Sequence, residues 1–215
     1  MNRSPNPQEP PYARQLSRLT RHYADFDFFF IKGIREHAVR GLQLSLGGRV
    51  LDLGCGGGGS FPYLEKAVGS RGKIVGVDVS PQSCINARRR AKNNGWENVS
   101  VIEASAQGVA LSEGFDGALM FAAPDVYGSE SALANILPHL KSHARIAIFG
   151  AKLSGGRLGL VLNPLFRFLV RTLSPATPIP DEAPWRLIAE RLEDLTLQEY
   201  FYGSMFLAYG TLKGH

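Results

Sequence analysis

The sequence predicts an α/β protein built on a doubly wound, mostly parallel sheet of seven strands. Short segments rich in apolar and β-branched residues alternate with helical patterns along most of the chain. One such segment runs into a glycine-rich turn at residues 50–59, and another, residues 73–78, ends in an aspartate. Strands that alternate with helices pair in parallel, because each helix packs back onto the sheet through a right-handed crossover.

Apolar periodicity and turn residues place the individual elements. A helix is expected over residues 80–93, because Ser80 and Pro81 favour a helix start and Asn94-Gly95 favours its end. Helical spacing of apolar residues predicts a second helix over residues 131–140, and a further helix is expected to start near Trp185. The predicted strands are residues 50–53, 73–78, 98–103, 114–121, 144–150, 195–202 and 205–212. The last two, joined at Gly203-Ser204, are expected to form an antiparallel hairpin that closes the sheet.

The most informative stretch is residues 50–59, in which an apolar strand passes through Asp52 into a run dominated by glycine. Glycine tolerates positive φ and close contact, so such a turn brings bare backbone next to a ligand. A helix after the turn would point its first N–H groups into the same space and favour a polar or anionic ligand. Asp52 argues against a pure phosphate cradle, so the stretch is interpreted as a nucleoside-cofactor loop.

Two motifs compete for these glycines. Gly54, Gly56 and Gly59 satisfy G-x-G-x-x-G, the dinucleotide fingerprint. Asp52 and the glycines at 54, 56 and 58 satisfy D-x-G-x-G-x-G, which resembles motif I of the class I S-adenosylmethionine-dependent methyltransferases, a family with a Rossmann-like fold. A carboxylate repels a nearby pyrophosphate, whereas S-adenosylmethionine carries an ammonium and a sulfonium and no phosphate. Asp52 therefore favours the methyltransferase over a nicotinamide-dependent oxidoreductase.

Asp78 ends the second predicted strand, where open α/β sheets bind their ligands. A carboxylate there can accept hydrogen bonds from both hydroxyls of a ribose. Dinucleotide enzymes use the same device, so Asp78 supports a nucleoside more firmly than one particular cofactor. The alternative is that Asp78 caps the following helix, but Ser80 can cap it unaided, which would leave Asp78 for the ligand.

The resemblance implies a set of cofactor-binding residues. In such an enzyme the motif glycines line the methionine and ribose parts of the cofactor, Asp52 faces the amino group, and Asp78 holds the ribose hydroxyls. The sequence departs from the family after the third strand, where Ser105 stands in place of an acid that often accepts from adenine. Serine binds the base more weakly, so backbone amides and stacking are expected to contribute there. The predicted set is Asp52, Gly54, Cys55, Gly56, Gly58, Asp78, Val79, Ser105, Ala106 and Phe121.

The segment after the fourth strand, residues 121–127, is expected to border the transferred methyl group and the acceptor. Methyltransferases that act on amino groups of nucleic acids or glutamine often have two prolines there, and this chain has only Pro124. That difference argues against N-methylation of a base or amide. Asp125 is a candidate catalytic residue that would orient or deprotonate the acceptor, with an acidic helix-start residue as the alternative. His22, His37 and Tyr127 are further candidates for a base, and no spacing distinguishes among them.

The clues to the acceptor lie outside the cofactor-binding half. The aromatic residues 23–31 resemble the tyrosine-containing N-terminal helix of ubiquinone/menaquinone-type methyltransferases, which makes Tyr23 a second candidate catalytic residue. The alternative is that these rings pack a helix onto the sheet. Residues 153–184 mix apolar residues with arginines after the fifth strand, where this fold builds its substrate lid. Such a lid suits a hydrophobic acceptor and can also touch a membrane surface. Trp185 and residues 200–202 are expected to belong to the core.

Length and composition indicate one domain. The chain has 215 residues, of which 16–215 are expected to form the domain after a disordered leader at 1–15. Two cysteines and scattered histidines predict neither disulfides nor a metal site and suit a cytoplasmic enzyme. The formal charge of +5 invites a nucleic-acid partner, but the densest basic cluster, residues 88–92, lies on a predicted helix whose solvated face explains it.

The residues and the resemblance together predict a methyltransferase that transfers a methyl group from S-adenosylmethionine to a small, hydrophobic or lipid-like acceptor. The transfer is an in-line displacement from an activated donor, so the protein's main tasks are alignment and exclusion of water. An RNA methyltransferase and a non-catalytic protein that binds S-adenosylmethionine are the alternatives.

Overall fold

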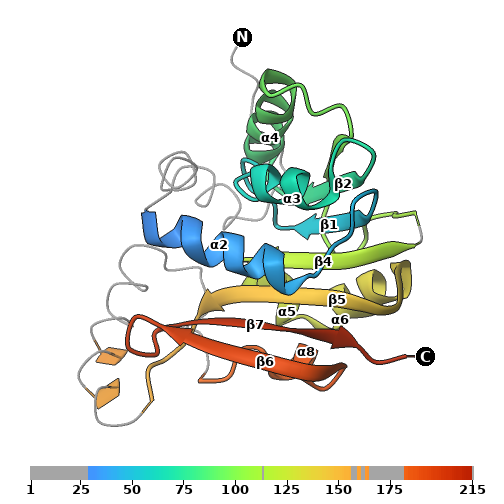
Figure 1. Ribbon diagram of the computed structural model, residues 1–215. Helices are drawn as coiled ribbons and strands as arrows, with labels where there is room; N and C mark the ends of the chain where they lie inside the picture. The colour runs from blue at the N-terminus through green and yellow to red at the C-terminus, as the bar shows by residue number, and fades with distance from the viewer. Residues whose placement is uncertain (1–28, 113, 156–158, 161–162, 165–181, 215) are drawn as a thin grey trace.

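The computed structural model describes residues 29–112, 114–155, 159–160, 163–164 and 182–214. They form a seven-stranded sheet with the strand order β3-β2-β1-β4-β5-β7-β6 (Figure 1). The strands are β1 Arg49–Leu53, β2 Lys73–Asp78, β3 Val99–Glu103, β4 Phe115–Phe121, β5 Leu140–Ala151, β6 Leu192–Tyr200 and β7 Met205–Leu212. The helices are α2 Phe29–Gly41, α3 Phe61–Val68, α4 Pro81–Asn93, α5 Pro124–Tyr127, α6 Glu130–Ile136, the 3₁₀ turn η1 Leu137–His139 and α8 Arg186–Ala189.

Strands β3, β2, β1, β4 and β5 pair in parallel, and β7 runs antiparallel between β5 and β6. Parallel pairing brings the carboxyl ends of β1, β2, β4 and β5 to one edge of the sheet. The predicted fold class is therefore confirmed, including the C-terminal hairpin. The turn of that hairpin lies at the same edge, since Ala151 at the end of β5 pairs with Met205 at the start of β7.

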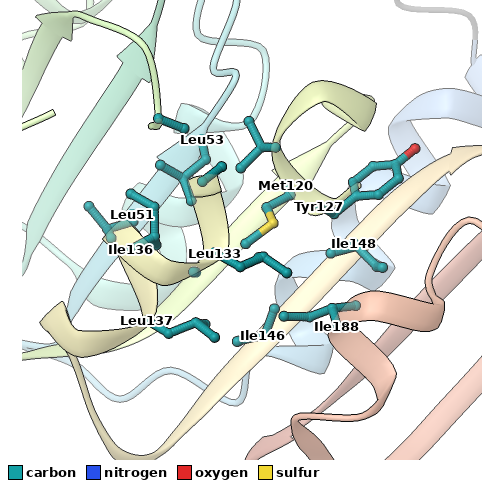
Figure 2. Close-up of a cluster of buried hydrophobic side chains, with 14 of the residues drawn as sticks. Leu51, Leu53, Met120, Tyr127, Leu133, Ile136, Leu137, Ile146, Ile148 and Ile188 are labelled. Atoms are coloured by element: carbon teal, nitrogen blue, oxygen red, sulfur yellow. The ribbon is translucent and has the colours of Figure 1, made fainter. Parts of the chain in front are cut away.

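Alternation along the strands sends side chains into two cores, one on each face of the sheet. On β1, Leu51 and Leu53 enter the core that α5, α6 and α8 cover, and Val50 enters the core under α2 and α3. Figure 1 shows these two groups of helices on opposite faces, and Figure 2 shows the first core, where apolar side chains from the strands meet those of α6 and α8. The two cores hold the carboxyl ends of the strands in a fixed position, as a binding site at that edge requires.

Several elements differ in extent from the sequence prediction, among them β5, which begins at Leu140 and not at residue 144. The helix expected over residues 131–140 ends at Ile136, because Pro138 cannot donate an N–H within the helix, and a 3₁₀ turn follows. The hairpin strand β6 stops at Tyr200, and Phe201 and Tyr202 turn with φ of 50° and 56°. Their side chains are 42% and 83% exposed, so the prediction that they belong to the core is wrong. Trp185, in contrast, packs against the first core as predicted.

Several predictions fall on residues that the structure does not describe. The leader at residues 1–15, Tyr23, His22 and most of the expected lid at residues 153–184 lie outside the described residues. The single domain over residues 16–215 and the lid therefore stay predictions. Within the described ranges, no helix is both long enough and apolar enough to cross a bilayer.

Candidate functional site

The glycine loop between β1 and α3 meets the open edge of the sheet. Gly54, Gly56 and Gly58 have φ of +68°, +54° and +77°, so the left-handed conformations fall on the three glycines of D-x-G-x-G-x-G. A Cβ on Gly54 would lie 2.7 Å from Ala123 Cβ, and one on Gly58 would lie 2.6 Å from the Phe61 ring. A Cβ on Gly56 would meet nothing within 4 Å. The loop therefore packs tightly on both sides of Gly56 and presents bare backbone to open space at that residue.

Backbone hydrogen bonds fix the loop to β2. The N–H groups of Gly54 and Cys55 both donate to Val77 O, at 2.8 and 3.1 Å. The Gly56 N–H donates to Asp78 Oδ2 at 2.8 Å, and the Ser80 N–H donates to Asp78 Oδ1 at the same distance. Asp78 thus joins the glycine loop to the start of α4.

Ser80 caps α4 as predicted, with its Oγ accepting from the Ser83 N–H at 3.3 Å. The inference that Asp78 is thereby left free is wrong, because each of its oxygens already accepts one backbone N–H. A carboxylate has about four acceptor sites, so both oxygens keep one for a ligand. Burial raises the pKa of Asp78, the two N–H donors lower it, and the nearby Asp125 charge raises it.

Asp52 is the least exposed acid of the site. It is 1% exposed in the centre of β1, and neither carboxylate oxygen has a hydrogen-bond partner among the described residues. Burial raises its pKa from 3.8 to about 7, the Arg35 charge lowers it, and Asp78 raises it. Buried polar groups are almost always paired, so this carboxylate is a candidate to accept hydrogen bonds from a ligand.

Arg35 on α2 lies against the same loop, although no sequence motif singles it out. Its Nη1 donates to Ser60 Oγ at 3.1 Å, and its guanidinium lies 4.3 Å from the centre of the Phe121 ring. A Cβ on Gly59 would come within 2.6 Å of Arg35 Nη1, which explains the last glycine of the loop without a dinucleotide. Helical spacing could have identified it. Arg35 lies four residues after Ile31 and four before Val39, on the face of α2 where an apolar residue is expected.

Two predicted residues contact the core more than the open edge. The Cys55 thiol is buried, its Sγ lies 2.9 Å from where a Gly76 Cβ would stand, and burial raises its pKa. Phe121 is 7% exposed and stacks on Phe149, with ring centres 4.3 Å apart, while Arg35 lies over the same ring. Cys55 can therefore offer a ligand its backbone, and Phe121 supports Arg35.

The predicted adenine-binding residues follow β2 and β3. Val79 is 36% exposed and lies between the half-buried Asp78 and the buried Ser80. Ser105 is exposed two residues after β3, and its carbonyl accepts from the N–H groups of Gly108 and Val109. Ala106 is 6% exposed. These residues lie at the same edge as the glycine loop, since β2 and β3 pair in parallel up to Asp78 and Glu103.

The candidate bases occupy different environments. Asp125 is exposed in the first turn of α5, as the helix-start alternative predicts, and partial burial of its carboxyl raises its pKa. Tyr127 is 2% exposed in the first core, where burial raises its pKa, so it is not available as a base. The His37 Nδ1 lies 3.2 Å from the Tyr200 hydroxyl. Among the described residues, no three His, Cys, Asp or Glu side chains are grouped as metal ligands would be.

β4 leaves the sheet through a strained residue. Ala122 has φ of +60°, and its N–H donates to Phe149 O at 2.8 Å. Non-glycine residues adopt this conformation at a cost of about 1–3 kcal/mol and are enriched at functional sites. The conformation brings Ala123 against Gly54 and so closes the gap between β4 and the glycine loop.

A family model and two curated relatives identify this chain as similar to methyltransferases. Residues 50–143 match a family model described as a methyltransferase domain. The chain is 32% identical over 175 residues to the aklanonic acid methyltransferase DauC of Streptomyces sp. strain C5, covering 69% of this chain and 71% of that protein. It is 27% identical over 192 residues to the 2-phytyl-1,4-naphtoquinone methyltransferase of Synechocystis sp. PCC 6803, covering 86% of this chain and 77% of that one.

The fold agrees with solved structures of the same kind. A methyltransferase from Aquifex aeolicus that depends on S-adenosylmethionine superposes with a TM-score of 0.60 at 22% identity, covering 83% of this chain and 89% of that one. The sheet order, the glycine loop beside two acids and the matched relatives lead to one assignment. This chain belongs to the class I S-adenosylmethionine-dependent methyltransferases.

Proposed function

We propose that this enzyme moves the methyl group of S-adenosylmethionine to a small, hydrophobic acceptor held beyond the carboxyl ends of β4 and β5, by in-line displacement. The observation that carries the proposal is the buried Asp52 carboxylate, which has no hydrogen-bond partner among the described residues and lies in the field of Arg35. When bound, the cofactor supplies a methyl group already activated by a sulfonium. The chain then has to bind, orient and exclude water.

The residues present fit the cofactor group by group. Asp52 offers an acceptor to the α-ammonium, and Arg35 offers a cation to the α-carboxylate. The remaining acceptor sites on Asp78 suit the ribose hydroxyls, and Val79 offers an exposed apolar surface to adenine. Ser105 and Ala106 would border the base, and the open backbone at Gly56 allows close approach.

A dinucleotide fits the same loop less well. Two carboxylates, Asp52 and Asp78, border the glycines, and a pyrophosphate there would face both at short range. Gly59, the third glycine of the dinucleotide fingerprint, has its close neighbour in Arg35. The carboxylates disfavour a pyrophosphate at the loop, and the contact with Arg35 accounts for Gly59 by packing alone.

The acceptor is proposed to be a hydrophobic small molecule. The names of the two relatives give aklanonic acid and 2-phytyl-1,4-naphtoquinone as the molecules that those enzymes methylate. In this chain, residues 153–184 supply apolar residues at the position of a lid, and Leu160 is 78% exposed. Tyr23 and Asp125 are the proposed residues nearest the reaction, and a base is needed only for an acceptor of high pKa.

RNA as the acceptor receives less support. The basic cluster on α4 is engaged within the protein: Arg88 donates to Val101 O at 2.9 Å, Arg89 to Asn86 Oδ1 at 3.2 Å, and Arg90 to Gly58 O at 3.4 Å. Arginines that already bond the protein offer fewer donors to phosphates. Through these hydrogen bonds, Arg88 contacts β3 and Arg90 contacts the glycine loop.

Calorimetric titration with S-adenosylmethionine, S-adenosylhomocysteine and NAD in parallel tests the proposal. We expect micromolar binding of the first two and none of NAD. The Asp78→Ala variant should bind S-adenosylmethionine at least tenfold more weakly, about 1.4 kcal/mol, because it loses the ribose acceptor. Binding of NAD alone, or unchanged affinity in a folded Asp78→Ala variant, would contradict the assignment of this loop.

A further inference from the structure

A buried lysine follows β5, outside the proposed cofactor site. Lys152 is 5% exposed, and Leu153 and Ser154 after it are 6% and 2% exposed. Lysine is almost never buried without a partner. The segment lies beyond the carboxyl end of β5, at the edge where the Gly54 loop also lies, and the Lys152 N–H donates to Ser204 O at 2.9 Å in the hairpin turn. Lys152 therefore lies on the side of the site proposed for the acceptor.

Among the described residues, the Lys152 ammonium has one strong partner, and that partner is half exposed. Its Nζ lies 2.8 Å from Glu199 Oε1 on β6 and donates to Leu153 O at a longer 3.4 Å. The side chain of Lys152 is 6% exposed and that of Glu199 is 49% exposed. The cation is thus the inner member of the pair, and the carboxylate can move into water at little cost in solvation.

Two residues near this ion pair, Ser154 and Gly203, bear on whether a ligand can bind there. Ser154 Oγ is buried and has no hydrogen-bond partner among the described residues, although the Asn163 side chain pairs with both the N–H and the carbonyl of Ser154 at 2.9 Å. A Cβ on Gly203 would lie 3.2 Å from Glu199 Oε2 and 3.9 Å from Lys152 Nζ. Gly203 therefore places no side chain against the ion pair on the hairpin side.

Aromatic rings form the wall behind the lysine. Lys152 Nζ lies 5.8 Å from the Trp185 ring, and the Trp185 and Phe206 rings are 4.8 Å apart. Phe206 in turn meets the Tyr127 ring edge-on at 5.9 Å. Phe206 and Tyr127 are buried in the first core, so the partly buried Trp185 is the ring that can face a ligand beside the Lys152 ammonium, with the Ser154 hydroxyl two residues further along the same segment. This set matches a planar aromatic molecule that carries an anionic oxygen.

We propose that Lys152 and Ser154 form an oxyanion subsite for the acceptor, flanked by Trp185. The carboxylate, phenolate or enolate oxygen of an aromatic acceptor replaces Glu199 as the partner of Lys152 Nζ and accepts from Ser154 Oγ, while Glu199 turns to solvent. This inference rests on the proposed function and deepens it, because it makes the acceptor an acidic aromatic molecule and makes Glu199 a competitor for the subsite.

The test compares 2-naphthoate with its neutral isostere 2-naphthamide by calorimetry on the full chain. Lys152→Met should weaken the binding of 2-naphthoate at least tenfold. The affinities for 2-naphthamide and S-adenosylhomocysteine should stay within twofold of those of the unmodified protein. Glu199→Gln should tighten 2-naphthoate about threefold or more, because it removes the competing carboxylate. Lys141→Met is the matched control, since Lys141 pairs with Asp116 at the opposite end of β5 and should leave both probes unchanged.

The two substitutions are expected to change 2-naphthoate affinity in opposite directions, which distinguishes a ligand-binding role of Lys152 from a purely structural ion pair. If the pair only ties β5 to β6, Lys152→Met and Glu199→Gln lower stability together and do not discriminate between the two probes, which overturns the subsite. If Lys152→Met does not fold, Glu199→Gln decides by itself: tighter 2-naphthoate supports the subsite, and unchanged or weaker binding overturns it. If the unmodified protein does not bind S-adenosylhomocysteine, the proposed function is contradicted instead. The comparison of the two naphthalene probes would still test whether Lys152 binds an anionic oxygen.

Discussion

Asp52 and Lys152 are buried to almost the same extent, at 1% and 5% exposed, but they differ in whether a partner lies beside the charge. Lys152 has Glu199 at 2.8 Å, whereas Asp52 has no hydrogen-bond partner among the described residues. A buried charge is costly unless it is paired. The side proposed for the cofactor therefore holds a buried acid without a partner among the described residues, and the side proposed for the acceptor holds a buried lysine whose partner is half exposed.

The largest expected effect comes from removing the unpaired acid. Asp52→Asn should weaken S-adenosylmethionine binding about 100-fold, or about 2.7 kcal/mol, because the amide cannot pair with the α-ammonium as a carboxylate does. Calorimetry of the variant and the unmodified protein at pH 8 measures this. A loss below threefold in a folded variant would mean that Asp52 does not face the cofactor.

The same substitution should stabilise the free protein at high pH. Burial raises the folded pKa of Asp52 to about 7 from its ordinary value of 3.8, so its contribution to stability is lost as pH rises from about 4 to 7. The stability of Asp52→Asn relative to the unmodified protein should therefore grow by about 2–3 kcal/mol between pH 5 and pH 8. Urea unfolding at the two pH values measures this difference.

Asp116→Asn provides the control of opposite sign. Lys141 and the Arg49 N–H bond the Asp116 carboxylate, and these interactions lower its pKa despite partial burial. Its contribution to stability is present above the unfolded pKa and is lost as pH falls. The variant should therefore be less stable than the unmodified protein at pH 8, and the difference should shrink in acid.

Cofactor affinity should depend on pH through Asp52. The ionised carboxylate is the form that pairs with the ammonium, so affinity should fall about tenfold for each pH unit below 7 and level off above about pH 8. The Asp52→Asn variant should show a flat profile over pH 6 to 8. Equal slopes in the two proteins would show that another group controls binding.

Two alanine substitutions separate ligand contact from packing within one loop. Gly56→Ala places a Cβ in open space and should weaken S-adenosylmethionine about tenfold, with a stability loss of about 1–2 kcal/mol from the left-handed φ. Gly58→Ala drives a Cβ against Phe61 and should destabilise more than Gly56→Ala. Chemical unfolding and calorimetry on both variants measure the contrast, and an equal loss of stability would contradict it.

The smallest effect is expected in the acceptor half. Leu160→Ala removes an exposed apolar side chain from the predicted lid and should weaken 2-naphthamide about threefold, while S-adenosylhomocysteine affinity stays within twofold. Leu46→Ala is a suitable control, because Leu46 is 72% exposed and precedes β1, at the opposite end of that strand from the glycine loop. Equal losses of both ligands in Leu160→Ala would assign the residue a structural role.

The sequence predicted the local structure of residues 50–83 well because the features of that segment are encoded locally. The glycine loop, Asp78 and the Ser80 cap lie within about thirty residues, and each depends on φ or on a backbone donor nearby in the chain. Helix 131–140 was predicted too long because the apolar spacing was weighed without Pro138. The exposed aromatic turn at residues 201–202 was assigned to the core because hydrophobicity alone does not reveal a positive φ.

By itself, the sequence determined the fold class, the alternation of strands and helices and the glycine loop with its acids, because periodicity, turn residues and glycine conformations act over a few residues. Only the tertiary structure brought Arg35 of α2 against Ser60 and the field of Asp52, and Lys152 against Glu199 and Trp185. These groups come from elements far apart in the chain. Their charges matter only where the packed sheet excludes water, and local sequence patterns do not record that exclusion.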